Sequence, residues 1–185
     1  SDAAGRHPVA AAARPLRDLH ARTRETVNLG VLRHDRVVYL DVIESTMPLR
    51  RVASRTSDPF HTTALGRVIA SRLPVDRRTR LIARAKLGRR TPATITDRRR
   101  LAEAIAAADR QGHAIEENET DVGVACIAAP VCAAAEVVGA ISVSLPTARL
   151  DAAGRRRLVA LVRQTAATIS ARLQSPSPVP RKESR

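Results

Sequence analysis

Residues 123–146 constrain the fold of this chain more than any other part of its sequence. They contain two nearly uninterrupted apolar runs, 124–131 and 137–145, joined by the short link 132–136. Each run is short for a globular helix and rich in β-branched residues, which favours strands. Strands that are apolar along their whole length have both faces covered. We therefore predict a long antiparallel hairpin at the centre of a sheet.

Three polar-capable side chains interrupt these apolar runs: Cys126, Ser142 and Ser144. Because strand side chains alternate between the two faces, Ser142 and Ser144 emerge on the same face. A buried hydroxyl without a partner costs about 1–3 kcal/mol, so both need one. Two interpretations stay open. The hydroxyls bond neighbouring backbone, or their face forms the floor of a small polar ligand pocket.

The length of 185 residues fits one domain with a full core. No apolar run approaches the roughly 18 residues that a membrane-spanning helix needs. The first 13 residues lack the apolar region of a signal peptide, and the chain starts with Ser1, which predicts a piece of a longer protein. We expect a linker at 1–13, a domain at 14–174 and a disordered Pro/Ser-rich tail at 175–185.

The two cysteines, Cys126 and Cys132, are six positions apart. On one extended strand their Cα atoms are about 20 Å apart, at roughly 3.3 Å per residue, which is too far for a disulfide. Free thiols fit a cytoplasmic protein.

The net charge is +14, and almost all cations are arginines. Basic domains attract nucleic acid. However, Phe60 and Tyr39 are the only aromatic residues, so platforms for base stacking are missing. The arginines are predicted on the outward faces of several helices, where they are solvated. Direct nucleic-acid binding through 77–90 and 98–100 is the weaker alternative.

The rest of the sequence adds helices and further strands. We expect strands at 26–33, 37–43, 49–53 and 113–118, and helices at 8–24, 61–71, 75–86, 97–111 and 151–174. Pro15 is expected to kink the first helix or start a second one. Thr96 is the expected N-cap of the helix at 97–111, and 54–60 has loop composition. The sum is an α+β fold with a mostly antiparallel sheet.

The sequence contains no phosphate loop, no metal-spaced Cys/His cluster and no nucleophile elbow. A catalytic Cys126 needs a base, and only His61, distant in sequence, could approach it in space. A metal site from Cys126, Glu116 and a histidine is an unspecific alternative. A loop that enters a helix at 61–66 leaves free amide groups, which suit a carboxylate. The residues favour binding over catalysis.

Several segments, taken in order, resemble one known family. They are ETVNL (25–29), VVYLDVIE (37–44), HTTALG (61–66), the segment 112–119, GVACIAAPV (123–131) and AISVSLP (140–146). Together they resemble the effector-binding domain of IclR-family transcriptional regulators over about residues 16–173. The resemblance implies a single GAF/profilin-like domain with a mostly antiparallel sheet flanked by helices. In the family it follows an N-terminal winged helix-turn-helix, which this chain lacks.

The resemblance also implies a binding site for a small carboxylate metabolite. Its expected members are Phe60, Ala64, Leu65, Glu116, Cys126, Ser142 and Ser144. Amides of Ala64 and Leu65 and the serine hydroxyls can donate to a carboxylate. Glu116 beside an anion has to be protonated or to accept from a ligand hydroxyl, because two bare carboxylates repel. Phe60 and Leu65 supply apolar walls.

The loop at 54–60, which covers this pocket in the family, departs from the family pattern. It lacks the usual glycine before the proline and carries Arg55 and Asp58. Arg55 either pairs with a second ligand carboxylate or is a solvated loop arginine.

We therefore predict a non-enzymatic sensing domain of a homodimer or tetramer in the cytoplasm, with no cofactor and no metal. It contacts operator DNA only through the missing N-terminal domain and has no membrane partner. The alternative is a thiol-dependent enzyme on a GAF-like fold that uses Cys126.

Overall fold

The computed structural model describes residues 8–47 and 56–174. In this part of the chain, the strands are β1 (Thr26–Arg33), β2 (Arg36–Ile43), β3 (Ser57–Pro59), β4 (Ala114–Glu117), β5 (Val124–Ala133) and β6 (Glu136–Pro146). The α-helices are α1 (Pro8–Thr23), α2 (Ala64–Ser71), α3 (Val75–Arg84), α4 (Arg98–Gln111) and α5 (Ala152–Gln174).

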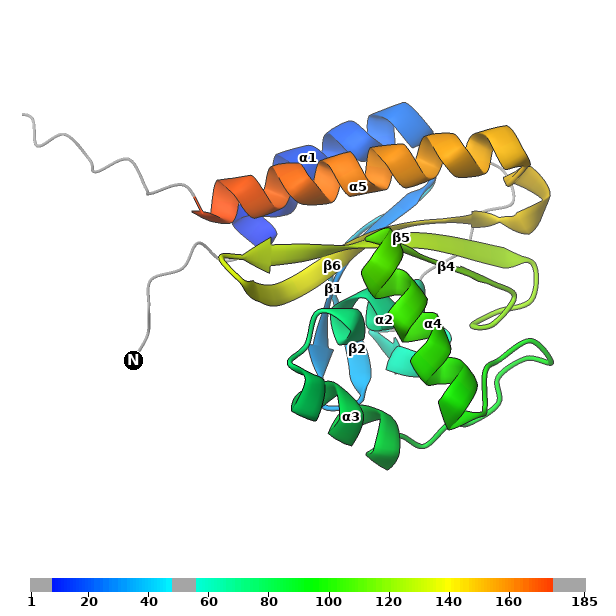
Figure 1. Cartoon of the computed structure of the whole chain (residues 1–185). Coiled ribbons are helices and arrows are strands. Elements are labelled where there is room, and N and C mark those ends of the chain that lie inside the picture. Colours follow the sequence, from blue (N-terminus) through cyan, green and yellow to red (C-terminus); the bar gives the residue numbers. More distant parts are fainter. Residues whose placement is uncertain (1–7, 48–55, 175–185) are drawn as a thin grey trace, which may run out of the picture.

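All paired strands run antiparallel in one sheet with the order β3-β2-β1-β6-β5-β4. Helices α1 and α5 lie along one face, and α2 and α4 cover the other (Figure 1). The predicted α+β fold with a mostly antiparallel sheet is confirmed.

The predicted central hairpin is formed by β5 and β6. β6 is hydrogen-bonded to β1 on its other side, and β5 to β4, so neither strand is at an edge. The hairpin contains a register shift between Val131 and Cys132, and its turn places Ala134 at a φ of 53°. The apolar character of both runs follows from this position, because helices cover both faces.

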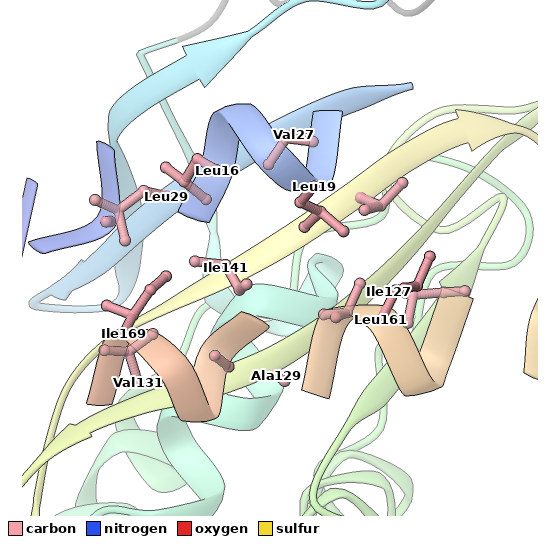
Figure 2. Packing of buried hydrophobic residues seen from close by; sticks show 14 of the residues in the cluster. Leu16, Leu19, Val27, Leu29, Ile127, Ala129, Val131, Ile141, Leu161 and Ile169 are labelled. Atoms are coloured by element: carbon pink, nitrogen blue, oxygen red, sulfur yellow. The ribbon is translucent and has the colours of Figure 1, made fainter. Parts of the chain in front are cut away.

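The alternation of side chains divides the interior into two cores. Val27 and Leu29 of β1, with Ile127 of β5, face α1 and α5 (Figure 2). Cys126 and Ala128 point the other way, toward α2 and α4. Each polar residue of the hairpin is therefore assigned to a core by its position in the strand.

Helix α1 is one continuous helix that contains Pro15, so the prediction that a second helix starts there is wrong. Leu16 and Leu19 of α1 are 0% and 2% exposed and belong to the same core as Ile169 of α5. Figure 2 shows these side chains between the helices and the sheet. Burying one such leucine contributes about 1.5–3 kcal/mol, which holds the proline in place despite its missing N–H.

Helices α2 and α4 begin later than expected. Asp97, not Thr96, is the N-cap of α4, since its carboxylate accepts from the N–H of Arg100 at 2.8 Å. Residues Phe60–Thr62 form a short 3-10 helix, and α2 starts at Ala64 with Thr63 as its N-cap. Both true caps provide a side-chain oxygen three residues before the amide that it accepts from, which satisfies one free donor of the first turn.

Residues 57–59 were expected in a loop, but they form the short edge strand β3. Arg36 holds β3 through its guanidinium, whose Nε donates to Ser57 Oγ at 2.9 Å. The expected strand at 49–53, the loop residue Arg55 and the expected tail at 175–185 lie outside the described residues. None of the helices at 8–47 and 56–174 is long and apolar enough to cross a membrane.

Candidate functional site

Strand register places three of the predicted site residues in one row across the sheet. Glu116 of β4 is opposite Cys126 of β5, which is opposite Ser144 of β6. Their exposed fractions are 1%, 8% and 2%. The row lies on the face that packs against α2, because Cys126 belongs to that core. The structure thus brings together residues that are far apart in the sequence.

A second row holds the other predicted serine and a residue that sequence analysis missed. Ser142 is opposite Ala128 on one side and Asn28 of β1 on the other. Asn28 Nδ2 donates to the Oγ atoms of Ser142 and Ser144, both at 3.1 Å. The serines therefore bond a side chain, and the interpretation that they bond neighbouring backbone is wrong.

This arrangement leaves hydrogen-bonding capacity unused. Each serine oxygen accepts from Asn28, so each hydroxyl can also donate its own proton. Ser144 Oγ also lies 3.1 Å from Cys126 Sγ. Asn28 Oδ1 is buried and has no hydrogen-bond partner among the described residues. A buried acceptor in this state is satisfied when a donor from outside the chain reaches it.

Glu116 is the titratable group of the site. Its Oε2 accepts from the N–H of Glu119 at 3.1 Å, while its Oε1 has no partner among the described residues. Burial raises the pKa of Glu116 to about 7, against the smaller lowering effects of Cys126 and the Glu119 amide. Near neutral pH, the carboxyl is therefore present in both its protonated and its ionised form.

The start of α2 faces the same side of the sheet. Thr63 Oγ1 accepts from the N–H of Gly66 at 3.0 Å, and the Thr63 carbonyl accepts from Arg67. No hydrogen bond between described residues uses the N–H groups of Ala64 and Leu65. These are two of the free donors that every helix leaves in its first turn.

Close packing holds this helix start against the core. A Cβ atom at Gly66 would lie 2.2 Å from the Phe60 carbonyl oxygen, so only glycine fits there. The Leu65 side chain reaches β1, where its Cδ1 would lie 3.3 Å from a Cβ at Gly30. Ala64, Leu65 and Phe60 are all at most 2% exposed.

His61 has a structural contact of its own. Its Nε2 lies 3.1 Å from the Gly88 carbonyl oxygen, and its ring makes an edge contact with Phe60 at a centroid distance of 6.2 Å. Burial lowers the pKa of His61, with the Gly88 contact acting in the opposite direction. The histidine thus joins the 3-10 helix to the loop around residue 88.

A buried ion pair that was not predicted from the sequence lies next to the site. The Arg67 guanidinium of α2 donates to both carboxylate oxygens of Glu119, with Nη1 to Oε1 at 2.9 Å. Its Nη2 also donates to the His61 carbonyl at 3.0 Å, and its Nε has no partner among the described residues. Because the Glu119 amide bonds Glu116, this pair fixes the position of Glu116. An arginine inside the apolar sequence of α2 was the available signal.

Asp58, which departs from the family pattern, has a structural role. It is completely buried, accepts from the Tyr39 hydroxyl at 2.8 Å and pairs with Arg90 at 2.6 Å. Arg90 also lies 3.7 Å from Asp121. These contacts join β2 and β3 to the loops at 88–95 and 118–123.

The two cysteines are free, as predicted, with Cys126 buried and Cys132 partly buried. Within residues 8–47 and 56–174, no group of three or more His, Cys, Asp or Glu side chains could hold a metal ion. The arginines of α3 and α4 are largely at the surface, as expected. Arg67 of α2, in contrast, is buried.

A few polar groups that converge in mostly apolar surroundings, here between the sheet and the start of α2, are typical of a small-molecule binding site. The family model described as "Bacterial transcriptional regulator IclR C-terminal" matches residues 2–171. The chain belongs to this family, and the resemblance seen in the sequence is confirmed.

Individual relatives agree with this assignment. The chain is 31% identical over 159 residues to the HTH-type transcriptional regulator KdgR of Dickeya chrysanthemi, covering 84% of this chain and 52% of that protein. The chain thus spans about half the length of this relative. The relatives are transcriptional regulators, and they lend no support to the thiol-enzyme alternative.

Two solved structures resemble the fold. The C-terminal domain of Escherichia coli KdgR superposes with a TM-score of 0.81 at 28% identity, covering 91% of this chain and 99% of that one. A double mutant of the inducer-binding domain of the transcription factor PobR from Acinetobacter, in complex with 3-hydroxybenzoic acid, gives a TM-score of 0.76 at 26% identity. That match covers 89% of this chain and 98% of that one.

Proposed function

We propose that this chain is the effector-sensing domain of a bacterial transcriptional regulator. A small organic acid binds between the sheet and the start of α2, and its binding changes the affinity of an attached helix-turn-helix domain for operator DNA. The observation that carries the proposal is a pair of buried oxygens with no hydrogen-bond partner among residues 8–47 and 56–174, Asn28 Oδ1 and Glu116 Oε1, on the sheet face that α2 covers.

The site offers donors for a carboxylate. The free N–H groups of Ala64 and Leu65 and the hydroxyl protons of Ser142 and Ser144 can bond an anionic oxygen. Protonated Glu116 adds another donor and removes the repulsion between two carboxylates. Cys126 flanks the site, and Phe60 with Leu65 forms its apolar boundary.

A hydroxyl group on the acid would donate a hydrogen bond to one of the unused acceptors. Asn28 Oδ1 and ionised Glu116 both accept hydrogen bonds, so an acid with a hydroxyl group satisfies more of the site than one without. The solved structure of the PobR inducer-binding domain, a structural relative, contains an acid of this kind, 3-hydroxybenzoic acid.

Coupling to DNA requires that the ligand bind one state of the regulator more tightly than another. From the family, we expect this regulator to be a homodimer or tetramer in the cytoplasm. We assign the contact with DNA to the helix-turn-helix outside this chain. The sensing domain itself needs no cofactor, metal or catalytic residue for this role.

A thermal-shift screen of the domain against mono- and dicarboxylates, including aromatic hydroxy acids, tests the proposal. A ligand that binds only the native state raises the melting temperature. The shift should disappear in the double variant Ser142→Ala/Ser144→Ala and persist in Ser170→Ala, which removes a hydroxyl that bonds the Cys132 amide from α5. A shift that survives the double variant would place the ligand elsewhere and contradict the proposed site.

A further inference from the structure

A groove of about 540 Å³ lies between α3 and the turn that joins β1 to β2. Figure 1 shows α3 beside the end of β1 and β2 where this turn lies. The groove shares no lining residue with the predicted effector site, whose side chains are at most 8% exposed. Its volume is within the range of roughly 300–1,000 Å³ that is usual for small-molecule sites.

The groove is strongly basic. Arg33 lines it from the end of β1, and Arg77, Arg80 and Arg84 line it from α3. The only carboxylate in its lining is Asp35. The three arginines of α3 are at positions i, i+3 and i+7, which lie on one helix face.

These arginines are unpaired within the part of the chain that the structure describes. None of the four makes a hydrogen bond or ion pair through its side chain with another described residue. By contrast, other arginines of the chain are paired, for example Arg149 with Glu25 and Arg155 with Glu117. Four guanidinium groups held around one groove with a single carboxylate leave a strong preference for an anion.

The rest of the lining is apolar. Leu32, Leu73 and Leu81 lie between the charged groups, and α3 has no fully buried residue. A groove that combines leucines with arginines fits a ligand with an apolar body and anionic groups at its periphery. It is less suited to duplex DNA, whose phosphates would contact the arginines and leave the leucines unused.

We propose that the α3 groove is a second binding site, specific for an organic dianion with an apolar body. A phosphate monoester with an apolar group and an aromatic dicarboxylate both meet this description, because each combines two negative charges with an apolar body. The site is independent of the effector site, so the domain can respond to two acids at separate positions.

Calorimetric titration of the whole domain tests this with small probes. Phenyl phosphate and phthalate carry two charges on an apolar ring, inorganic phosphate lacks the ring, and benzyl alcohol lacks the charge. We expect one or both ringed dianions to bind at least about tenfold more tightly than inorganic phosphate or benzyl alcohol, since each lacks one of the two contacts. Which of the two binds more tightly distinguishes a phosphorylated ligand from a dicarboxylate.

Two variants locate the site. Arg77→Gln/Arg80→Gln should weaken binding about tenfold or more, as two charge-assisted contacts are lost. The control Arg110→Gln/Arg156→Gln removes the same charge from exposed positions on α4 and α5 and should leave affinity unchanged. Binding should also persist in Ser142→Ala/Ser144→Ala, which separates this site from the effector site.

Several results would overturn the proposal. One is no binding of either ringed dianion to the unmodified domain, and another is an equal loss of affinity in the control variant. The third is a change of oligomeric state in Arg77→Gln/Arg80→Gln, measured by light scattering, which would assign the groove to a second copy of the chain. Binding of a DNA duplex through the same arginines, without binding of the small probes, would assign it to nucleic acid.

Discussion

Asn28 of β1 joins the two serines of β6 through one amide group: its Nδ2 lies 3.1 Å from both Ser142 Oγ and Ser144 Oγ. The three side chains are at most 2% exposed. The contact crosses between strands that are more than 100 positions apart in the chain. It sets the direction in which both hydroxyl protons can donate and leaves Asn28 Oδ1 without a partner among the described residues.

Replacing Asn28 should destabilise the domain. Asn28→Ala removes two hydrogen bonds and leaves a void among buried hydroxyls, so we expect the free energy of unfolding to fall by about 2 kcal/mol. Urea denaturation followed by circular dichroism measures the change. Gln164→Ala removes an exposed amide from α5 and should change stability by less than about 0.5 kcal/mol. Equal losses in the two variants would contradict the role of Asn28.

Glu116 should make stability depend on pH. Its folded pKa of about 7 is above the unconstrained value of 4.5, so the folded protein binds this proton more tightly than the unfolded chain. The contribution is complete below pH 4.5 and declines as pH rises through about 7, by on the order of 3 kcal/mol. In Glu116→Gln, which resembles the protonated acid, this decline should be absent.

The measurement is the free energy of unfolding from pH 4 to pH 8 for both proteins. Other titrating groups affect both curves in the same way, so the difference between the curves isolates Glu116. Curves that stay parallel across this range would show that the buried carboxyl is not the titrating group.

Gly66 should tolerate no side chain. In Gly66→Ala the new Cβ would lie 2.2 Å from the Phe60 carbonyl oxygen, and this neighbour is backbone, so the start of α2 has to move. We expect a loss of about 3 kcal/mol and weaker binding of any acid at the Ala64 and Leu65 amides. Gly88→Ala is the control, because nothing lies within 4 Å of its Cβ position. Thermal unfolding compares them, and similar melting temperatures would refute the packing argument.

The ion pair between Arg67 and Glu119 should be important for stability because it is buried. The two side chains are 4% and 13% exposed, and Arg67→Met leaves the Glu119 carboxylate without its cation. We expect a loss of about 3–5 kcal/mol. Arg99→Met breaks the pair with Glu103, whose side chains are 82% and 62% exposed, and should cost less than about 0.5 kcal/mol.

Chemical denaturation of the two variants provides this comparison. The double variant Arg67→Met/Glu119→Gln should recover part of the loss, because it removes the uncompensated charge as well. If Arg67→Met and Arg99→Met lose similar stability, the buried pair has no special role.

Much of the fold could be predicted from local patterns. The apolar runs at 124–131 and 137–145 predicted the hairpin, and their alternation placed Ser142 and Ser144 on one face. These predictions depend only on the period of two in a strand, which is a property of neighbouring residues. The capping residues Thr63 and Asp97 were within local reach too, but adjacent polar residues competed for each position.

Only the tertiary structure decided the contacts between segments that are distant in the sequence. Strand register determines that Asn28 meets Ser142, and helix packing determines that Arg67 reaches Glu119. No local period contains this information, because a shift of one residue in register would turn every side chain to the other face. The sequence by itself thus determined which residues are polar within the core, and the assembled sheet decided which of them meet.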